Sequence, residues 1–103
     1  MGTYRGKLEI IADILHAASR KPKKTQIMYQ ANLSFRVLQK YLAEVSNASL
    51  ICFEDETQCY DLTSKGVAFL DAYKLYTKSN RHAEKILGEV NLKKQTLEKL
   101  VNL

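Results

Sequence analysis

The sequence predicts a mainly α-helical fold with a small β-hairpin, a winged helix-turn-helix followed by a long C-terminal dimerisation helix. Three observations predict this fold: a capped amphipathic helix that follows a short helix and a tight turn, two short alternating segments, and a heptad repeat in the last third. The 103 residues are enough to bury one small core but not two. We expect residues 1–66 to form the winged helix-turn-helix domain and residues 67–103 the dimerisation helix.

The first helix is predicted to run from Tyr4 or Lys7 to Ser19, because apolar residues recur there at helical spacing. His16 lies near its end with no nucleophile or carboxylate partner placed beside it, so we interpret it as a surface or core-edge residue and not as a catalytic base. Pro22 disfavours helical geometry in the residue before it and ends the helix. The predicted apolar side consists of Leu8, Ile10, Ile11, Ile14 and Leu15.

A helix-turn-helix is predicted next, with a short helix over residues 25–31, a turn at residues 32–33 and a second helix over residues 34–46. Ser34 is a suitable N-cap, because its hydroxyl can accept a hydrogen bond from a free N–H of the first turn. An ordinary helical hairpin with a solvated basic face would show the same pattern. The predicted apolar stripe of the second helix consists of Phe35, Leu38, Leu42 and Val45, with Tyr41 at its edge.

The opposite side of this helix carries Arg36, Gln39, Lys40 and Ala43, a set of groups suited to a polyanion. Arginine can bridge the acceptors of guanine in the major groove, and glutamine can pair with adenine. The basic linker before the motif, residues 20–24, is expected to hold phosphates, although a solvated charged loop is the commoner use of such a run. Thr25 is expected to cap the helix that follows. The predicted DNA-binding residues are Lys21, Lys23, Lys24, Thr25, Ser34, Arg36, Gln39 and Lys40.

Two short strands are predicted over residues 50–54 and 58–62, joined by a turn at residues 55–57. Alternation places Ile51 and Phe53 on one face, where Tyr60 and Leu62 can join them. The pairing sets Phe53 opposite either Tyr60 or Gln58. This hairpin is the predicted wing.

The outer face of the wing carries Cys52 and Cys59 under either pairing. A cross-strand disulfide is conceivable, but in a reducing cell we expect two free thiols. The tip is acidic, with Glu54, Asp55 and Glu56 in succession, and an acidic tip should be repelled by a phosphate backbone.

The last helix is predicted to begin with Thr63 or Ser64 as N-cap and to carry apolar residues at alternating spacings of four and three. We call these positions the seam. Because one helix cannot bury such a seam alone, we expect a homodimer; a helix that folds back across its own domain is the alternative. Gly88 predicts a kink or an end near residues 88–91. The seam consists of Phe69, Tyr73, Tyr76, Asn80, Ala83 and Leu87, which we assign to dimerisation, and then Val90, Lys94, Leu97 and Val101.

The net charge of +5 and the pI of 9.3 favour anionic partners such as nucleic acid. No apolar run is long enough to span a bilayer and the N-terminus lacks a signal-peptide core, so we expect an intracellular protein without a membrane partner. Two cysteines without a ligand pattern predict no metal, and we expect no cofactor. The chain has no glycine-rich phosphate loop and no nucleophile-base pair, so we do not expect an enzyme.

The segments KLEIIADIL, PKKTQIMYQANLSFRVLQKYL and YDLTSKGVAFL, followed by a long helix, resemble the small archaeal winged-helix DNA-binding proteins of the 10a type, which dimerise through an antiparallel coiled coil of their C-terminal helices. The resemblance covers about residues 7–87 and is most specific over residues 25–34 and 62–66. It implies binding of double-stranded DNA in a transcriptional or chromatin-organising role, an archaeal source and a cytoplasmic, nucleoid-associated location. It also implies that residues 34–45 form the recognition helix and residues 50–62 the wing.

Two features depart from the family: the acidic wing tip and the tail beyond Leu87. The acidic tip keeps a second interpretation open, in which the winged helix docks on a partner protein without binding DNA.

Overall fold

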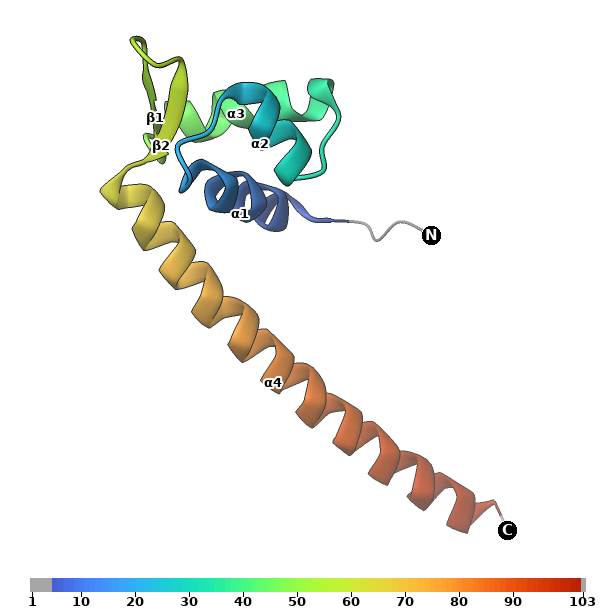
Figure 1. The fold of residues 1–103 in the computed structure, drawn as a ribbon. Helices are drawn as coiled ribbons and strands as arrows, with labels where there is room; N and C mark the ends of the chain where they lie inside the picture. The colour runs from blue at the N-terminus through green and yellow to red at the C-terminus, as the bar shows by residue number, and fades with distance from the viewer. Residues whose placement is uncertain (1–4, 103) are drawn as a thin grey trace. The chain divides into compact units, whose positions relative to one another are not determined.

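A computed structural model describes residues 5–102 of the chain (Figure 1). The elements follow in the order α1 (Lys7–Ala18), α2 (Lys24–Gln30), α3 (Phe35–Asn47), β1 (Ile51–Glu54), β2 (Cys59–Leu62) and α4 (Ser64–Val101). The chain therefore is mainly helical with one two-stranded antiparallel hairpin and a long C-terminal helix, as predicted. It divides into two compact units, one ending at Ala72 and one beginning at Tyr73. The assignment of residues 1–66 and 67–103 to separate roles stays a prediction.

Helices α1, α2 and α3 confirm the first three predicted helices, with ends that differ by one or a few residues. A start of the first helix at Tyr4 lies outside the described residues. Ser34 caps α3 as predicted, since its Oγ accepts a hydrogen bond from the Val37 N–H at 3.3 Å. Asn32 adopts a φ of 54° in the turn before it, a left-handed conformation that asparagine tolerates better than most residues.

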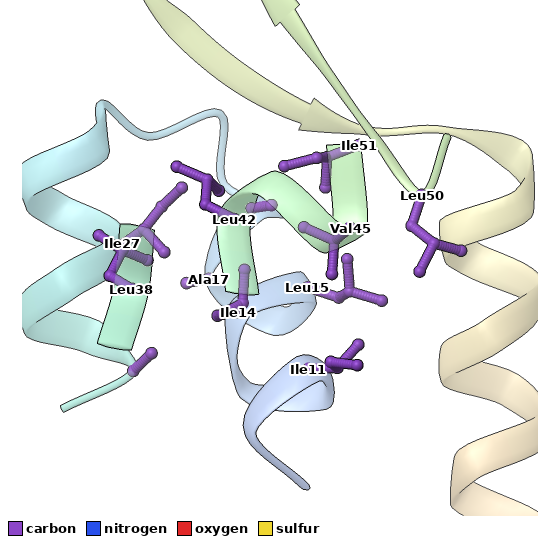
Figure 2. Packing of buried hydrophobic residues seen from close by; sticks show 12 residues of the cluster. Ile11, Ile14, Leu15, Ala17, Ile27, Leu38, Leu42, Val45, Leu50 and Ile51 are labelled. Carbon is purple, nitrogen blue, oxygen red and sulfur yellow. The ribbon is translucent and has the colours of Figure 1, made fainter. Parts of the chain in front are cut away.

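The core of the first unit lies between α1, α2 and α3 and extends to β1 (Figure 2). Five large side chains in it are completely buried. Leu38, Leu42 and Val45 face it from α3, which confirms three members of the predicted stripe. The five are Ile14, Leu15, Ile27, Leu38 and Val45.

Three residues of the first unit predicted on apolar faces are exposed instead. Phe53 of β1 is 44% exposed. Leu8 belongs to the first turn of α1 and is 48% exposed, and Phe35 is the first residue of α3 and is 58% exposed. Leu8 and Phe35 both lie in the first turn of their helix, where periodicity predicts the direction of a side chain but not whether the core extends that far. Tyr41 is half-buried at the edge of the stripe, as predicted.

Thr25 does not cap α2, which contradicts the prediction. The helix begins at Lys24 and its N-cap is Lys23, whose backbone N–H donates to Gln26 Oε1 at 2.8 Å. The Gln26 side chain thus accepts a hydrogen bond from the backbone N–H of the N-cap residue, as the glutamine of a capping box does.

The hairpin pairs Phe53 with Tyr60 and Ile51 with Leu62, so the alternative pairing of Phe53 with Gln58 is wrong. Gln58 instead lies in the turn with a φ of 57°. The centres of the Phe53 and Tyr60 rings lie 4.9 Å apart. Burial raises the pKa of the Tyr60 phenol.

Cys52 lies opposite Asp61 and Cys59 opposite Glu54, which places the two sulfurs diagonally on the same face of the hairpin, as predicted. Both cysteines are free thiols. Each Sγ donates to a nearby carbonyl, that of Asp61 at 3.7 Å for Cys52 and that of Thr57 at 3.3 Å for Cys59.

Helix α4 begins with Thr63 as its N-cap, because Thr63 Oγ1 accepts a hydrogen bond from the Gly66 N–H at 3.0 Å. The helix continues through Gly88 to Val101, so the predicted break near residues 88–91 is wrong. A single glycine weakens a helix by about 1 kcal/mol, which is too little to interrupt 38 residues of otherwise continuous helical sequence.

Every described side chain from Lys78 onward is exposed, including the apolar members of the seam. Within residues 5–102, none of the helices has the length and apolar character needed to cross a bilayer. The same residues contain no group of three or more His, Cys, Asp or Glu side chains that could hold a metal ion.

Candidate nucleic-acid interface

The outer face of α3, which we define as Arg36, Gln39, Lys40 and Ala43, is exposed at all four positions. It is exposed because Leu38, Leu42 and Val45 occupy the opposite side of the helix and fix its orientation against the core. The packing of the first unit therefore presents the two cations and the amide to solvent.

The acidic residue of α3, Glu44, does not oppose this charge. Its carboxylate is half-buried and lies 3.6 Å from the Lys7 ammonium of α1. Glu44 is thus turned toward α1, and the outer face carries positive charge without a carboxylate among its own residues.

Three side chains from α2 and α3 form a group that we call the Lys24 cluster: Lys24, Phe35 and Gln39. The Lys24 ammonium donates to Gln39 Oε1 at 3.1 Å and lies 4.8 Å from the centre of the Phe35 ring. The structure therefore brings two predicted DNA-binding residues, Lys24 and Gln39, into contact. It adds Phe35, which the sequence had placed in the core.

The Lys40 ammonium lies 5.3 Å from the centre of the neighbouring Tyr41 ring. Such a cation-π contact is weak at an exposed site, on the order of 0.5 to 1 kcal/mol, and leaves the charge accessible.

The basic linker before α2 exposes Lys21 and Lys23, while Pro22 between them is buried. Thr25, the second residue of α2, is exposed as well. The Pro22 carbonyl accepts a hydrogen bond from the Tyr60 N–H at 2.8 Å, so β2 holds the middle of the linker in place. The lysine side chains are consequently presented from a fixed backbone. The Ser34 hydroxyl, another predicted contact, is engaged in capping α3.

Arg5 is a residue of this region that the sequence did not reveal. Its guanidinium lies 2.7 Å from Asp13 and donates to the carbonyl oxygens of Ala31 and Asn32, each at 2.7 Å. Arg5 therefore ties α1 to the turn between α2 and α3, and it positions the start of α3 without belonging to the outer face. Arg5 lies 26 and 27 residues from Ala31 and Asn32 in the sequence, so no local sequence pattern could have predicted these hydrogen bonds.

The wing tip is exposed and acidic as predicted, with Glu54, Asp55 and Glu56 all open to solvent. Phosphates would be repelled by it. The charge of the first unit is therefore divided between a basic surface on α3 and the linker and an acidic one at the tip.

Residues 4–81 match the family described as winged helix-turn-helix. Among solved structures, the chain is similar to the crystal structure of Sso10a-2, a DNA-binding protein from Sulfolobus solfataricus. The two share 26% sequence identity with a TM-score of 0.77, over 84% of this chain and 94% of that chain. No curated protein matches the chain.

Proposed function

This chain belongs to the winged helix-turn-helix family, and from that premise we propose that it binds double-stranded DNA through the outer face of α3. The observation that carries the proposal is the exposure of Arg36, Gln39 and Lys40 together on the side of α3 opposite the core. The similarity to the DNA-binding protein Sso10a-2 supports it.

In the proposed complex α3 lies in the major groove, as the second helix of such motifs does. Arg36 bridges the two acceptors of guanine, and Gln39 pairs with adenine. Lys40 adds charge on the same face. The role is binding and not catalysis.

The linker supplies contacts that set the position of the protein on the duplex without identifying bases. Lys21 and Lys23 are exposed for this role on a backbone that the Pro22 carbonyl holds to β2. Thr25 can donate its hydroxyl to a phosphate oxygen. Lys24 contributes its charge from within the Lys24 cluster, and Ser34 acts through the cap that starts α3.

We also propose that α4 pairs two copies of the chain. Its seam carries exposed apolar side chains over many turns, among them Tyr76 at 55%, Leu87 at 61% and Leu97 at 65%. A helix with such a seam gains stability by burying it against a second helix. In a homodimer the two recognition helices would contact two half-sites.

Sedimentation of the purified protein at micromolar concentration tests this pairing. The wild type should sediment as a dimer and Leu87→Lys as a monomer, because the substitution places a charge in the seam. Leu92→Lys is the matched control: Leu92 is 66% exposed and lies on the helix side opposite the seam, so this variant should remain a dimer. A monomeric wild type would contradict the proposal.

DNA binding of this kind fits a transcriptional or chromatin-organising role. The resemblance to the archaeal 10a proteins supports an archaeal source and a cytoplasmic, nucleoid-associated location.

Fluorescence anisotropy with a labelled random duplex across a salt series tests DNA binding. The affinity should fall steeply as salt rises, because lysine and arginine release counterions from the phosphates. Arg36→Ala should cost about 1 to 3 kcal/mol and flatten any sequence preference, whereas Lys23→Ala should weaken all sequences alike and lower the salt slope by about one.

Arg81→Ala provides the matched control, since it removes the same charge from an exposed position of α4. It should leave the affinity close to that of the wild type. Equal losses from Arg36→Ala and Arg81→Ala would show that the net charge matters and that the outer face of α3 does not.

The exposed acidic wing tip favours one other function, in which the domain docks on a partner protein. That function predicts no steep salt dependence with random duplex DNA. It also predicts that Arg36→Ala does not alter duplex binding.

A further inference from the structure

Phe35 occupies an unusual place for a phenylalanine. It is the first residue of α3 and is 58% exposed, although Leu38, Leu42 and Val45 on the same side of the helix are buried. The aromatic ring therefore lies at the end of the helix that enters the major groove in the proposed complex. Residues at this end of a recognition helix are the ones that contact base edges.

The ring is held in place by the Lys24 cluster. The Lys24 ammonium lies 4.8 Å from the ring centre and donates to Gln39 Oε1 at 3.1 Å. Phe35 and Gln39 are four residues apart on α3, a spacing that puts their side chains side by side on the helix surface. The Lys24 ammonium thus contacts both the Phe35 ring and the Gln39 amide and holds them next to each other.

The major groove offers a partner for each of these two groups. The C5 methyl of thymine is the apolar group on its floor, and phenylalanine is one of the side chains that contact it. Adenine presents an N7 acceptor and an N6 donor that a glutamine amide matches. The pair of groups held by Lys24 therefore corresponds to the chemistry of A·T base pairs.

We propose that Phe35 contacts thymine C5 methyl groups in the major groove and gives the protein a preference for duplexes that contain A·T pairs. This inference rests on the proposed DNA binding and deepens it, because it names the base that the start of α3 recognises. Lys24 acts as a positioning residue, since it holds both Phe35 and Gln39.

Replacing thymine by uracil tests the contact, because uracil lacks the C5 methyl and keeps the same hydrogen-bonding groups. Two labelled duplexes of one sequence, with all thymines or all uracils, are titrated in the same salt. Wild type should bind the thymine duplex more tightly, by about fourfold for each recognition helix, which corresponds to the burial of about one methyl group. A duplex of G·C pairs should gain affinity when its cytosines carry a 5-methyl group.

Phe35→Ala should bind the thymine and uracil duplexes equally, and Phe35→Leu should retain part of the difference because leucine still offers an apolar surface. The exposed ring contributes little to the core, so both variants should unfold at the urea concentration of the wild type. The thymine-uracil comparison on the wild type stands even if a variant fails to fold.

Equal binding of the two duplexes by the wild type would overturn the inference, and so would a thymine preference that persists in Phe35→Ala. In either case, salt-dependent binding of both duplexes would leave the proposed function intact. Failure of the wild type to bind any duplex would overturn both.

Discussion

The two compact units of this chain differ in whether their large apolar side chains are buried. The first unit, which ends at Ala72, buries Ile14, Leu15 and Leu38 completely. The second, which begins at Tyr73, leaves Leu87, Leu97 and Val101 more than half exposed. The first unit therefore has a core of its own within a single chain, whereas the second leaves large apolar side chains in solvent.

The first unit positions α3, and the role proposed for the second unit is to pair two copies of the chain. In the first unit a core orients α3, so that cations on its far side stay in solvent. In the second unit the helix is formed but its apolar surface has no core to enter, and a second copy would complete it. Substitutions matched between the two units should accordingly give unequal results.

Replacing a leucine by alanine should give the largest difference in unfolding free energy between the two units. Leu38→Ala empties a completely buried site and should lower the free energy of unfolding by about 2 to 5 kcal/mol. Leu92→Ala, at a position that is 66% exposed and off the seam, should change it by less than about 0.5 kcal/mol. Urea denaturation at one fixed protein concentration measures both. Similar losses would show that Leu92 is buried in the native state and break the comparison.

Alanine at the two glycines of α4 should act with opposite signs. A Cβ at Gly66 would collide with the Leu50 carbonyl oxygen and come within 3.0 Å of Leu62 Cδ2, so Gly66→Ala should destabilise the first unit by about 1 to 3 kcal/mol.

A Cβ at Gly88 would meet nothing within 4 Å, and Gly88→Ala should stabilise the helix by about 1 kcal/mol. Thermal unfolding followed by circular dichroism distinguishes the two variants. A lower midpoint for Gly88→Ala would mean that another surface packs closely against this position.

The smallest expected effect concerns arginine. Arg5→Ala removes an ion pair and two charge-assisted hydrogen bonds to the turn before α3, and should cost about 1 to 2 kcal/mol, since the side chain is still partly exposed. Arg81→Ala in the second unit should be nearly neutral.

Chemical denaturation gives both values. Hydrogen exchange then sharpens the result: the amides at the start of α3 should exchange faster in Arg5→Ala. Unchanged exchange there would refute the role of Arg5 in holding the turn.

The sequence was sufficient to predict where the helices and the hairpin lie and which side of α3 is exposed and basic, because each depends on local periodicity. Ser34 shows this, since a hydroxyl before an apolar repeat marked the start of α3 correctly. At α4 the sequence offered Thr63 or Ser64, and the structure has Thr63 as the cap.

The sequence was wrong on the Thr25 cap of α2 and on the break of α4 near Gly88. Periodicity gives the direction of a side chain but not the extent of the core, and Phe35 was misplaced for that reason.

Contacts between distant segments could not be predicted. Arg5 reaches carbonyl groups 26 and 27 residues away, and Lys24 meets Gln39 across the turn of the motif. The pairing of Phe53 was ambiguous because two neighbouring pairings keep the same inner face. The structure pairs Phe53 with Tyr60 and leaves Gln58 in the turn with a left-handed backbone.

Lysine acylation with and without duplex DNA, followed by mass spectrometry, tests the central claim most directly, because it reports which ammonium groups the duplex covers. The account predicts that Lys23 and Lys40 react readily in the free protein and are slowed several-fold by a random duplex, while Lys85 and Lys99 of α4 react at an unchanged rate. Poor reactivity of Lys40 in the free protein, or equal protection of Lys40 and Lys99 by DNA, would contradict it.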